Sequence, residues 1–108
     1  YNPGAEIIKT AKQFEFENKS VLMVVALKPE ENEQISVRVR VYPDSKENCL
    51  PANLKLAILS DWGNTLKEVT ARSIDSFIQL PSFRCSSEES FKLQLSLNNI
   101  NFIESFFL

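Results

Sequence analysis

The sequence has no histidine, only two glycines and only two cysteines among its 108 residues. Without histidine, the chain cannot form a Ser-His-Asp or Cys-His catalytic arrangement or an imidazole zinc site. Two cysteines cannot supply a four-thiolate zinc site. Two glycines cannot form a glycine-rich phosphate loop, and no G-x-S-x-G elbow occurs. We therefore predict no catalytic residue, no metal site and no cofactor, and a chain that is not an enzyme.

The sequence also lacks a long apolar run and a strong excess of charge. The longest apolar run, Val21–Leu27, has the length of a strand and is far shorter than a membrane span. Lys and Arg number 12 and Asp and Glu 14, which gives a net charge of −2. The basic residues are spread along the sequence, whereas nucleic-acid-binding domains carry clustered excess positive charge. We predict neither a membrane span nor a nucleic-acid partner.

The two cysteines, Cys49 and Cys85, lie far apart in segments that read as loops. One disulfide between them is an open alternative. Two reduced thiols in a cytoplasmic protein are the interpretation we favour, because disulfide-built secreted domains carry more cysteine. The chain starts at Tyr1 rather than at methionine and shows no signal peptide, so we expect a piece of a longer protein.

What is present is a series of short, strand-like segments. Apolar and polar residues alternate strictly in Ile35–Tyr42 and again in Phe91–Leu97, which is typical of strands with one buried face. The continuously apolar Val21–Leu27 fits a central strand that is buried on both faces or packed under a neighbour. Residues 5–17 are ambiguous between helix and strand, and we expect a strand in their second half.

Two hairpins are predicted from turn residues. Gly63-Asn64 suits a two-residue turn that places Ile58 opposite Val69, whereas a turn at Trp62-Gly63 would place Ile58 opposite Lys67. We favour the first register because it pairs apolar residues. A second two-residue turn at Asn98-Asn99 leads to four inward pairs, of which only Leu93 with Glu104 is not apolar. These pairs are Leu97 with Ile100, Leu95 with Phe102, Leu93 with Glu104, and Phe91 with Phe106.

These segments predict an all-β fold with seven or eight strands and almost no helix. Two antiparallel sheets packed face to face, as in an immunoglobulin-like β-sandwich, bury the alternating faces best. A small β-barrel is the alternative. The length fits one domain covering residues 1–108, with residues 1–17 as a less regular lead-in.

Several segments also resemble a known family. Leu50–Leu56, Arg72–Leu80 and Glu89–Phe91 carry the likeness, and Val21–Tyr42 is similar in pattern. From Val21 onward the chain resembles a cyanobacterial family of uncharacterised proteins, domain-of-unknown-function family eighteen twenty-two. The resemblance implies a C-terminal region of a longer protein in a bacterial, intracellular setting. It implies no activity and no site residues.

Candidate interaction residues come from two places. Arg38, Arg40 and Tyr42 share the polar face of one strand and could contact an acidic partner, although such stripes more often only make a sheet soluble. Trp62, in a predicted turn, could anchor a partner, but we expect it to pack over the sheet edge because large aromatic side chains are mostly buried. The carboxylates at Glu30–Glu33 and Glu88–Glu89 read as solvated turns rather than a calcium or glycosidase site.

Three functional hypotheses remain after these exclusions. The first is a non-catalytic β-sandwich module that contacts another protein or supports a neighbouring domain of the same chain. The second is a sandwich that binds carbohydrate or another small ligand, which needs a concave surface with exposed aromatics such as Trp62, Tyr1 and Tyr42. The third is an accessory domain of an enzyme whose catalytic part lies elsewhere.

Overall fold

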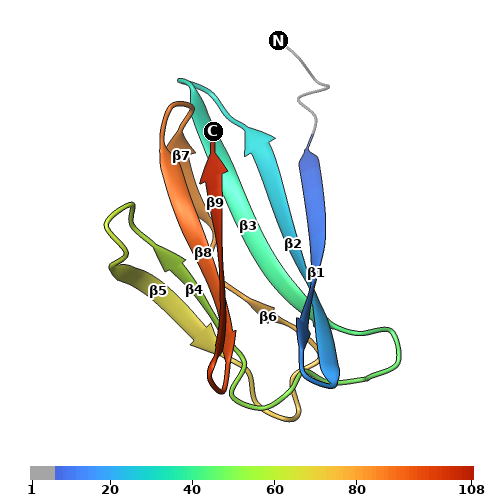
Figure 1. Ribbon diagram of the computed structural model, residues 1–108. Helices are drawn as coiled ribbons and strands as arrows, with labels where there is room; N and C mark the ends of the chain where they lie inside the picture. The colour runs from blue at the N-terminus through green and yellow to red at the C-terminus, as the bar shows by residue number, and fades with distance from the viewer. Residues whose placement is uncertain (1–6) are drawn as a thin grey trace.

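The computed structural model describes residues 7–108, which form nine β-strands and no helix (Figure 1). The predicted all-β class is confirmed. All paired strands run antiparallel. In chain order the strands are β1 (Ile8–Phe16), β2 (Lys19–Pro29), β3 (Gln34–Pro43), β4 (Lys55–Leu59), β5 (Thr65–Thr70), β6 (Ile78–Gln79), β7 (Phe83–Ser86), β8 (Ser90–Leu97) and β9 (Ile100–Phe107).

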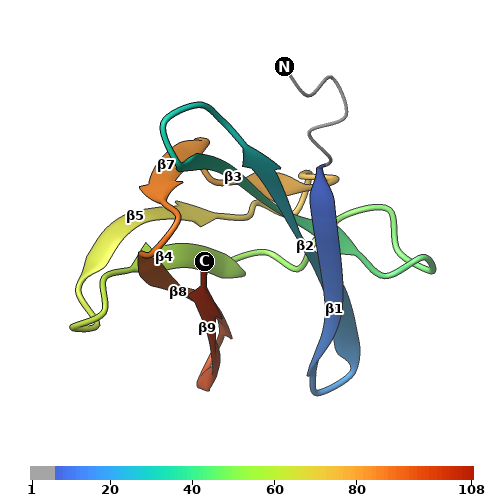
Figure 2. The same cartoon turned by 90° about the horizontal axis from the view of Figure 1, so that it is seen from above.

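The strands form two sheets rather than a closed barrel. Sheet A has the order β1-β2-β3-β6, with β7 also paired to β3, and sheet B has the order β5-β4-β8-β9. Figure 2 shows the two sheets as separate layers that diverge on the side of β1 and β9. The predicted sandwich is therefore confirmed and the barrel alternative is wrong.

The connections between the sheets follow the immunoglobulin pattern. The order β9-β8-β4-β5 matches the G-F-C-C′ sheet of such domains, and β3 with β6 and β7 matches their B–E pair. Both β4–β8 and β3–β7 join strands that are distant in sequence. β2 takes the place of strand A, and β1 is an additional strand beyond it.

The predicted number of seven or eight strands is wrong, because the segment after Pro81 forms one more. β6 pairs with Arg40 and Val41 of β3, and β7 pairs with Gln34–Val37 further along the same strand. Pro81 lies between them and has no N–H to donate to a ladder, so a single edge strand is divided into two short ones.

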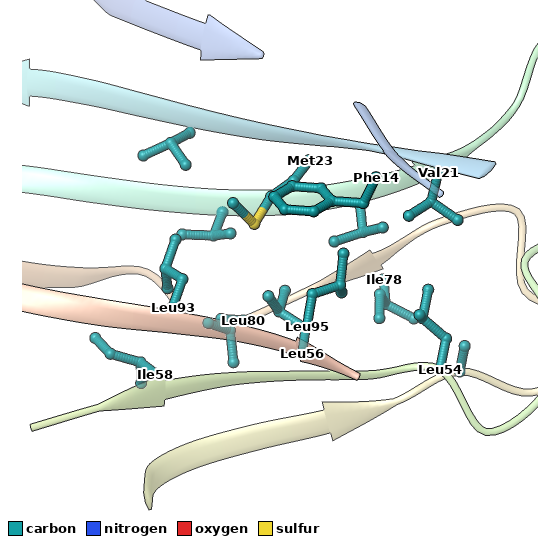
Figure 3. Close-up of a cluster of buried hydrophobic side chains, with 14 of the residues drawn as sticks. Phe14, Val21, Met23, Leu54, Leu56, Ile58, Ile78, Leu80, Leu93 and Leu95 are labelled. Carbon is teal, nitrogen blue, oxygen red and sulfur yellow. The ribbon is translucent and has the colours of Figure 1, made fainter. Parts of the chain in front are cut away.

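The core lies between the facing sides of the two sheets (Figure 3). Alternate residues of β3, namely Val37, Val39 and Val41, are fully buried there, and Leu56 of β4 lies opposite Leu95 of β8. The alternation that predicted the strands around Val39 and Leu95 therefore identifies the inward faces correctly. Figure 3 shows side chains of both sheets meeting, including Phe14 and Met23 from sheet A and Leu93 from sheet B.

β2 is the predicted central strand and lies between β1 and β3. Its inward residues Val21, Met23 and Val25 are buried, but Leu22 on the other side is exposed and Val24 is half-buried. Only one face of the continuously apolar segment is thus covered by the core. The other face remains an apolar strip on the outside of sheet A.

The favoured register of the β4–β5 hairpin is wrong. Ile58 lies opposite Lys67, not Val69. The three-residue loop Asp61–Gly63 places Leu59 opposite Thr65, and the pairing moves by one further residue before Ile58. The Gly63 N–H donates to the Ser60 carbonyl at 2.9 Å and Gly63 has φ +88°, as expected for a turn that ends in a left-handed residue. A register shift follows between Ile58 and Leu59. An edge strand tolerates this register because solvent reaches the exposed Lys67.

The β8–β9 hairpin forms as predicted. Leu97 lies opposite Ile100, and all four inward pairs have the expected register. Asn98 adopts φ 56°, which asparagine tolerates in tight turns. The rings of Phe91 and Phe106 stack with their centroids 5.2 Å apart. The hairpin closes sheet B at the edge next to β1.

Candidate functional site: the outer face of sheet A

Cross-strand pairing gathers polar and apolar side chains on the outer face of sheet A. Directly opposed residues of antiparallel strands lie on the same side of a sheet, and the buried valines of β3 fix which side is inward. The outward residues Arg38, Arg40 and Tyr42 of β3 therefore lie beside Ala26, Val24 and Leu22 of β2. The candidate residues of β3 are thus together on one surface, as the alternation predicted.

The outer face of sheet A carries more positive charge than the spacing of basic residues along the sequence indicates. Five cationic side chains share it, and we call them the cationic face: Lys9 of β1, Lys28 of β2, Arg38 and Arg40 of β3, and Arg84 of β7. None of the five forms an ion pair with an acidic residue in the described part of the chain. Acidic residues reach only its margin, at Glu15, Glu30 and Asp44. The basic residues that are dispersed in sequence are therefore concentrated in space.

Arg40 is fixed at the centre of this face by three neighbours. Its Nε donates to Oε1 of Gln79 at 2.6 Å, and its Nη1 donates to the Tyr42 hydroxyl at 3.2 Å. The guanidinium carbon lies 5.4 Å from the centroid of the Phe77 ring, a cation–π distance. The Phe77 and Tyr42 rings lie 5.9 Å apart. The guanidinium is thus held in place while its charge has no carboxylate partner among residues 7–108.

A shallow hollow adjoins Arg38 on the same face. It has a volume of about 190 Å³, and its lining includes Lys28, Ser36 and Ala26. The Ser36 hydroxyl donates to a carboxylate oxygen of Glu30 at 3.0 Å. Lys28 and Arg38 line the hollow together with Glu30, whose carboxylate offsets part of their positive charge.

Asp44 marks the acidic margin of the face near Tyr42. Its carboxylate accepts a hydrogen bond of 2.6 Å from the Ser20 hydroxyl and another from the Lys46 backbone N–H. These bonds, the Ser20 bond above all, lower the pKa of Asp44, so it is ionised at neutral pH. The positive surface therefore has a negative boundary at this end.

Trp62 is not part of this face, and the expectation that it packs over the sheet edge is wrong. It lies at the tip of the β4–β5 hairpin of sheet B, and 90% of its surface is exposed. The three-residue loop carries its side chain beyond β4. Beside it, a groove of about 450 Å³ runs between this hairpin and β7 and is lined partly by Leu66, Phe83 and Arg84.

The sequence therefore identified Arg38, Arg40 and Tyr42 correctly as a group, but missed Phe77 and Gln79. These two residues come from the segment around β6 and meet Arg40 only because β6 pairs with β3. Nothing in their local sequence indicates this contact. Of the three aromatics considered for ligand binding, Trp62 and Tyr42 belong to different sheets, and Tyr1 lies outside the described residues.

The other titratable groups with shifted pKa values have structural partners. Asp75 accepts hydrogen bonds from the side chain and backbone of Arg72, which lower its pKa. Glu89 accepts the backbone N–H of Ser86, and this lowers its pKa. Burial raises the pKa of the Cys85 thiol, which keeps it protonated. Cys49 and Cys85 are both free thiols.

The two acidic loops do not assemble into a site. Glu31, Glu33 and Glu88 are exposed, and Glu30 and Glu89 each bond to a nearby serine. Within residues 7–108, no three Cys, Asp or Glu side chains come together in a way that could hold a metal ion.

The family model described as "Protein of unknown function (DUF1822)" matches residues 3–107. The chain belongs to this family. The match extends the resemblance seen from Val21 onward to nearly the whole chain. Neither the curated proteins nor the solved structures include a match to this DUF1822 chain. No described segment forms a helix with the length and apolarity needed to cross a bilayer.

Proposed function

We propose that this DUF1822 domain is a non-catalytic module that binds an acidic protein surface through its cationic face. The main support is the group formed by Arg38, Arg40, Tyr42 and Phe77. Among residues 7–108 Arg40 has no carboxylate partner, and it donates to the Tyr42 hydroxyl and lies over the Phe77 ring. Arginine, tyrosine and other aromatic residues are the types most often found at the centres of protein interfaces. Fixing Arg40 before binding also reduces the entropy lost on association.

A protein partner fits this face better than a nucleic acid. The isoelectric point is about 5.2, whereas nucleic-acid-binding domains typically have values above about 9. The acidic margin at Glu15, Glu30 and Asp44 would repel a phosphate backbone that ran beyond the face. An acidic protein surface of limited extent avoids this repulsion.

The absence of catalysis is part of the proposal. It is supported by the lack of histidine and by the direction of the pKa shifts at Asp75 and Glu89, which is unsuited to a general acid at neutral pH. The partner surface belongs either to another protein or to a neighbouring domain of a longer chain. We expect this contact to form in the cytoplasm, where Cys49 and Cys85 stay reduced.

Charge reversal on the cationic face tests the proposal. The full-length wild-type protein and its Arg38→Glu/Arg40→Glu variant are used to capture partners from native cell extract, and the captured protein is then titrated in purified form by calorimetry. Lys46→Glu/Lys67→Glu is the matched control, because both residues are exposed, outside the cationic face, and give the same change in net charge. We expect an acidic partner whose affinity falls about tenfold or more only in the Arg38/Arg40 variant.

The outcomes are distinct. If the Lys46→Glu/Lys67→Glu control weakened binding by the same factor, net charge alone would explain the loss of affinity. That result would contradict a specific binding face. A partner that binds the Arg38/Arg40 variant as well as the wild type would also contradict the proposal, as would single-stranded nucleic acid that binds with micromolar affinity. If no separate protein is captured, hydrogen exchange in the full-length protein must show that a neighbouring domain protects β2 and β3. The proposal is rejected if neither a captured partner nor this protection is found.

The exposed Trp62 beside the groove of about 450 Å³ supports a second candidate function, the binding of a carbohydrate. Sugar rings stack on exposed aromatic faces, and the groove also presents the polar side chains of Asp61 and Arg84. Tryptophan fluorescence titrated with oligosaccharides tests this candidate, since Trp62 is the single tryptophan. A saturable change that Trp62→Ala abolishes would favour it over protein binding.

A further inference from the structure

Three of the four sheet edges have features that discourage pairing with another strand. β1 carries Lys9 and Lys12 along its length, and charged side chains, especially lysine, protect edges. β5 has an irregular register and carries Lys67 and Glu68. The remaining edge consists of the two short strands β6 and β7 on either side of Pro81. These edges are therefore poor templates for an added strand.

The edge formed by β9 has only one such feature, the inward charge of Glu104, and Lys12 of β1 pairs with that charge. Ile100–Phe107 pairs with β8 over eight residues without a register shift, and it contains neither lysine nor proline. Its single charged residue, Glu104, lies on the inward side, opposite Leu93, and forms an ion pair with Lys12. Its outward side presents Ile103 and Phe107, which are 55% and 83% exposed. A long, regular and apolar edge is the kind that recruits another strand.

The backbone of β9 has hydrogen-bonding groups on this edge that no other strand within residues 7–108 pairs with. Leu97 and Ile100 flank the two-residue turn, and hydrogen-bonded pairs alternate along an antiparallel ladder from that point. The even-numbered residues therefore bond toward β8, consistent with the Leu108 N–H donating to the Glu89 carbonyl at 3.1 Å. The N–H and C=O groups of Asn101, Ile103 and Ser105 then point away from β8, where only an extended strand can pair with several of them at once.

We propose that β9 pairs antiparallel with β9 of a second copy of this chain about a two-fold axis at Ile103. This register places Ile103 against Ile103 of the partner subunit and matches two further kinds of pair by polarity, whereas Phe102 lies opposite the partner's Glu104. Asn101 lies opposite the partner's Ser105 on the outer face, and Ile100 lies opposite the partner's Phe106 on the inner face. The two copies of sheet B become one continuous sheet, joined by an isologous contact.

Neighbouring registers fit less well. A two-fold axis at Glu104 would place this carboxylate against the same residue of the second copy, and like charges directly opposite each other destabilise a strand pair. It would also pair the apolar Ile103 with Ser105. Shifts by a single residue would oppose inward and outward side chains, because side chains alternate along a strand. The axis at Ile103 is thus preferred to the axis at Glu104, because it avoids two like charges directly opposite each other.

This contact is separate from the proposed function. The dimer edge belongs to sheet B, whereas the cationic face is the outer side of sheet A. Either surface can act without the other. A protein that dimerises but binds no acidic partner, or the reverse, would therefore reject one proposal and leave the other standing.

Cross-linking with a short bismaleimide tests the pairing and its register in the full chain. Ile103→Cys should cross-link to itself. Asn101→Cys and Ser105→Cys should each remain uncross-linked alone but form a mixed product when combined, because each faces the other across the axis. The wild type is the control for its own thiols, since Cys49 is half-buried and Cys85 is buried. Efficient cross-linking of Asn101→Cys alone, or none of Ile103→Cys, would overturn the proposed register.

The oligomeric state gives an independent measurement. Sedimentation equilibrium of the wild type should show a monomer–dimer equilibrium, and Ile103→Lys should leave only monomer because it places two like charges directly opposite each other at the axis. Ile74→Lys is the matched control: Ile74 is also exposed but lies in the loop before β6, so dimerisation should be unchanged. Circular dichroism checks that both variants remain folded. A folded Ile103→Lys protein that dimerises like the wild type, or a wild type that is monomeric at every concentration, would reject the proposal.

Discussion

Lys12 of β1 and Glu104 of β9 form an ion pair that connects the edge strands of the two sheets. The pair explains why a carboxylate lies opposite the buried Leu93, where an apolar residue is expected: its charge is directed toward β1. Phe102 lies two residues from Glu104 on the same side of β9. It packs against Phe14 and Phe16 of β1, with ring centroids 5.1 and 5.2 Å away. The aromatic contacts and the ion pair together hold this side of the sandwich.

We expect the ion pair to contribute little to stability despite its position. The Lys12 and Glu104 side chains are 60% and 32% exposed, so water screens their attraction. Lys12→Gln should lower the free energy of unfolding by less than about 1 kcal/mol, measured by urea denaturation. The difference should shrink further in high salt. A loss several times larger would show that the pair, rather than the adjacent aromatic rings, holds the two edges together.

Shortening a core side chain should have a much larger effect. Leu95 of β8 is fully buried opposite Leu56 of β4, so Leu95→Ala leaves a cavity between the sheets. We expect a loss of about 2–5 kcal/mol in the free energy of unfolding. Leu66→Ala is the control, because Leu66 is 59% exposed, and it should change stability by about 0.5 kcal/mol at most. Similar losses in both variants would mean that Leu95 does not lie in the core.

How much of this structure could be predicted depended on where the deciding contacts lie. The β8–β9 hairpin was predictable down to its register, because the Asn98-Asn99 turn and the alternating side chains both belong to one local segment. The β4–β5 hairpin was not, because apolar pairing favoured Val69 opposite Ile58, whereas the loop that ends at Gly63 and the register shift beside Leu59 set a different register. Local pairing preferences fail at an edge strand, where an exposed Lys67 costs little.

The candidate site likewise combines contacts that the local sequence predicts with contacts that it does not. The alternation in β3 grouped Arg38, Arg40 and Tyr42, but Phe77 and Gln79 join them through a pairing between strands distant in sequence. The exposure of Trp62 also escaped prediction, since the average tendency of tryptophan to be buried says nothing about one loop. Long-range pairing and loop length are the two properties that the local pattern does not contain.

The exposure of Trp62 has a spectroscopic consequence. As the single tryptophan and 90% exposed, it should emit at the long wavelength typical of solvated indole, and acrylamide should quench it almost as efficiently in the native as in the unfolded protein. Its fluorescence should therefore report unfolding poorly. Trp62→Ala should change the free energy of unfolding by about 0.5 kcal/mol at most, as for other exposed positions. A blue-shifted native emission would contradict the exposed position of this side chain.

Gly63 is expected to be required for its backbone conformation rather than for space. A Cβ atom built on it would meet no other atom within 4 Å, but its φ of +88° is unfavourable for residues with side chains. Gly63→Ala should cost about 1 kcal/mol of unfolding free energy. Gly63→Asn should cost less, because asparagine tolerates positive φ. Equal losses for both variants, seen by thermal unfolding, would point to steric crowding and contradict this explanation.

The hydrogen bonds at Asp75 predict a dependence of stability on acid pH. Its pKa is lowered from the ordinary value of 3.8 by bonds from Arg72, so folding favours the ionised form. The resulting stabilisation is complete above that ordinary pKa and is lost as the pH falls through the lower pKa of the folded state. In urea denaturation at a series of pH values, Asp75→Asn should lose less stability below about pH 4 than the wild type does.

Glu31→Gln provides the comparison for the pH series. Glu31 is exposed, and no hydrogen bond to its carboxylate occurs within residues 7–108. Its removal should leave the acid limb of the stability curve unchanged. If both variants flattened this limb equally, the loss at acid pH would reflect total charge rather than the Asp75–Arg72 contact.

The pairing of β4 with β8 sets the order in which the fold can be completed. Between these two partners the chain makes the β4–β5 hairpin and then crosses to sheet A for β6 and β7. Closing such a long loop is entropically costly, so domains with this connectivity reach the native state on a timescale of about milliseconds to seconds. During synthesis, the edge of β4 that pairs with β8 therefore has no partner strand until β8 has left the ribosome. An unpaired strand edge is a template for aggregation, so the nascent chain carries this hazard over that interval.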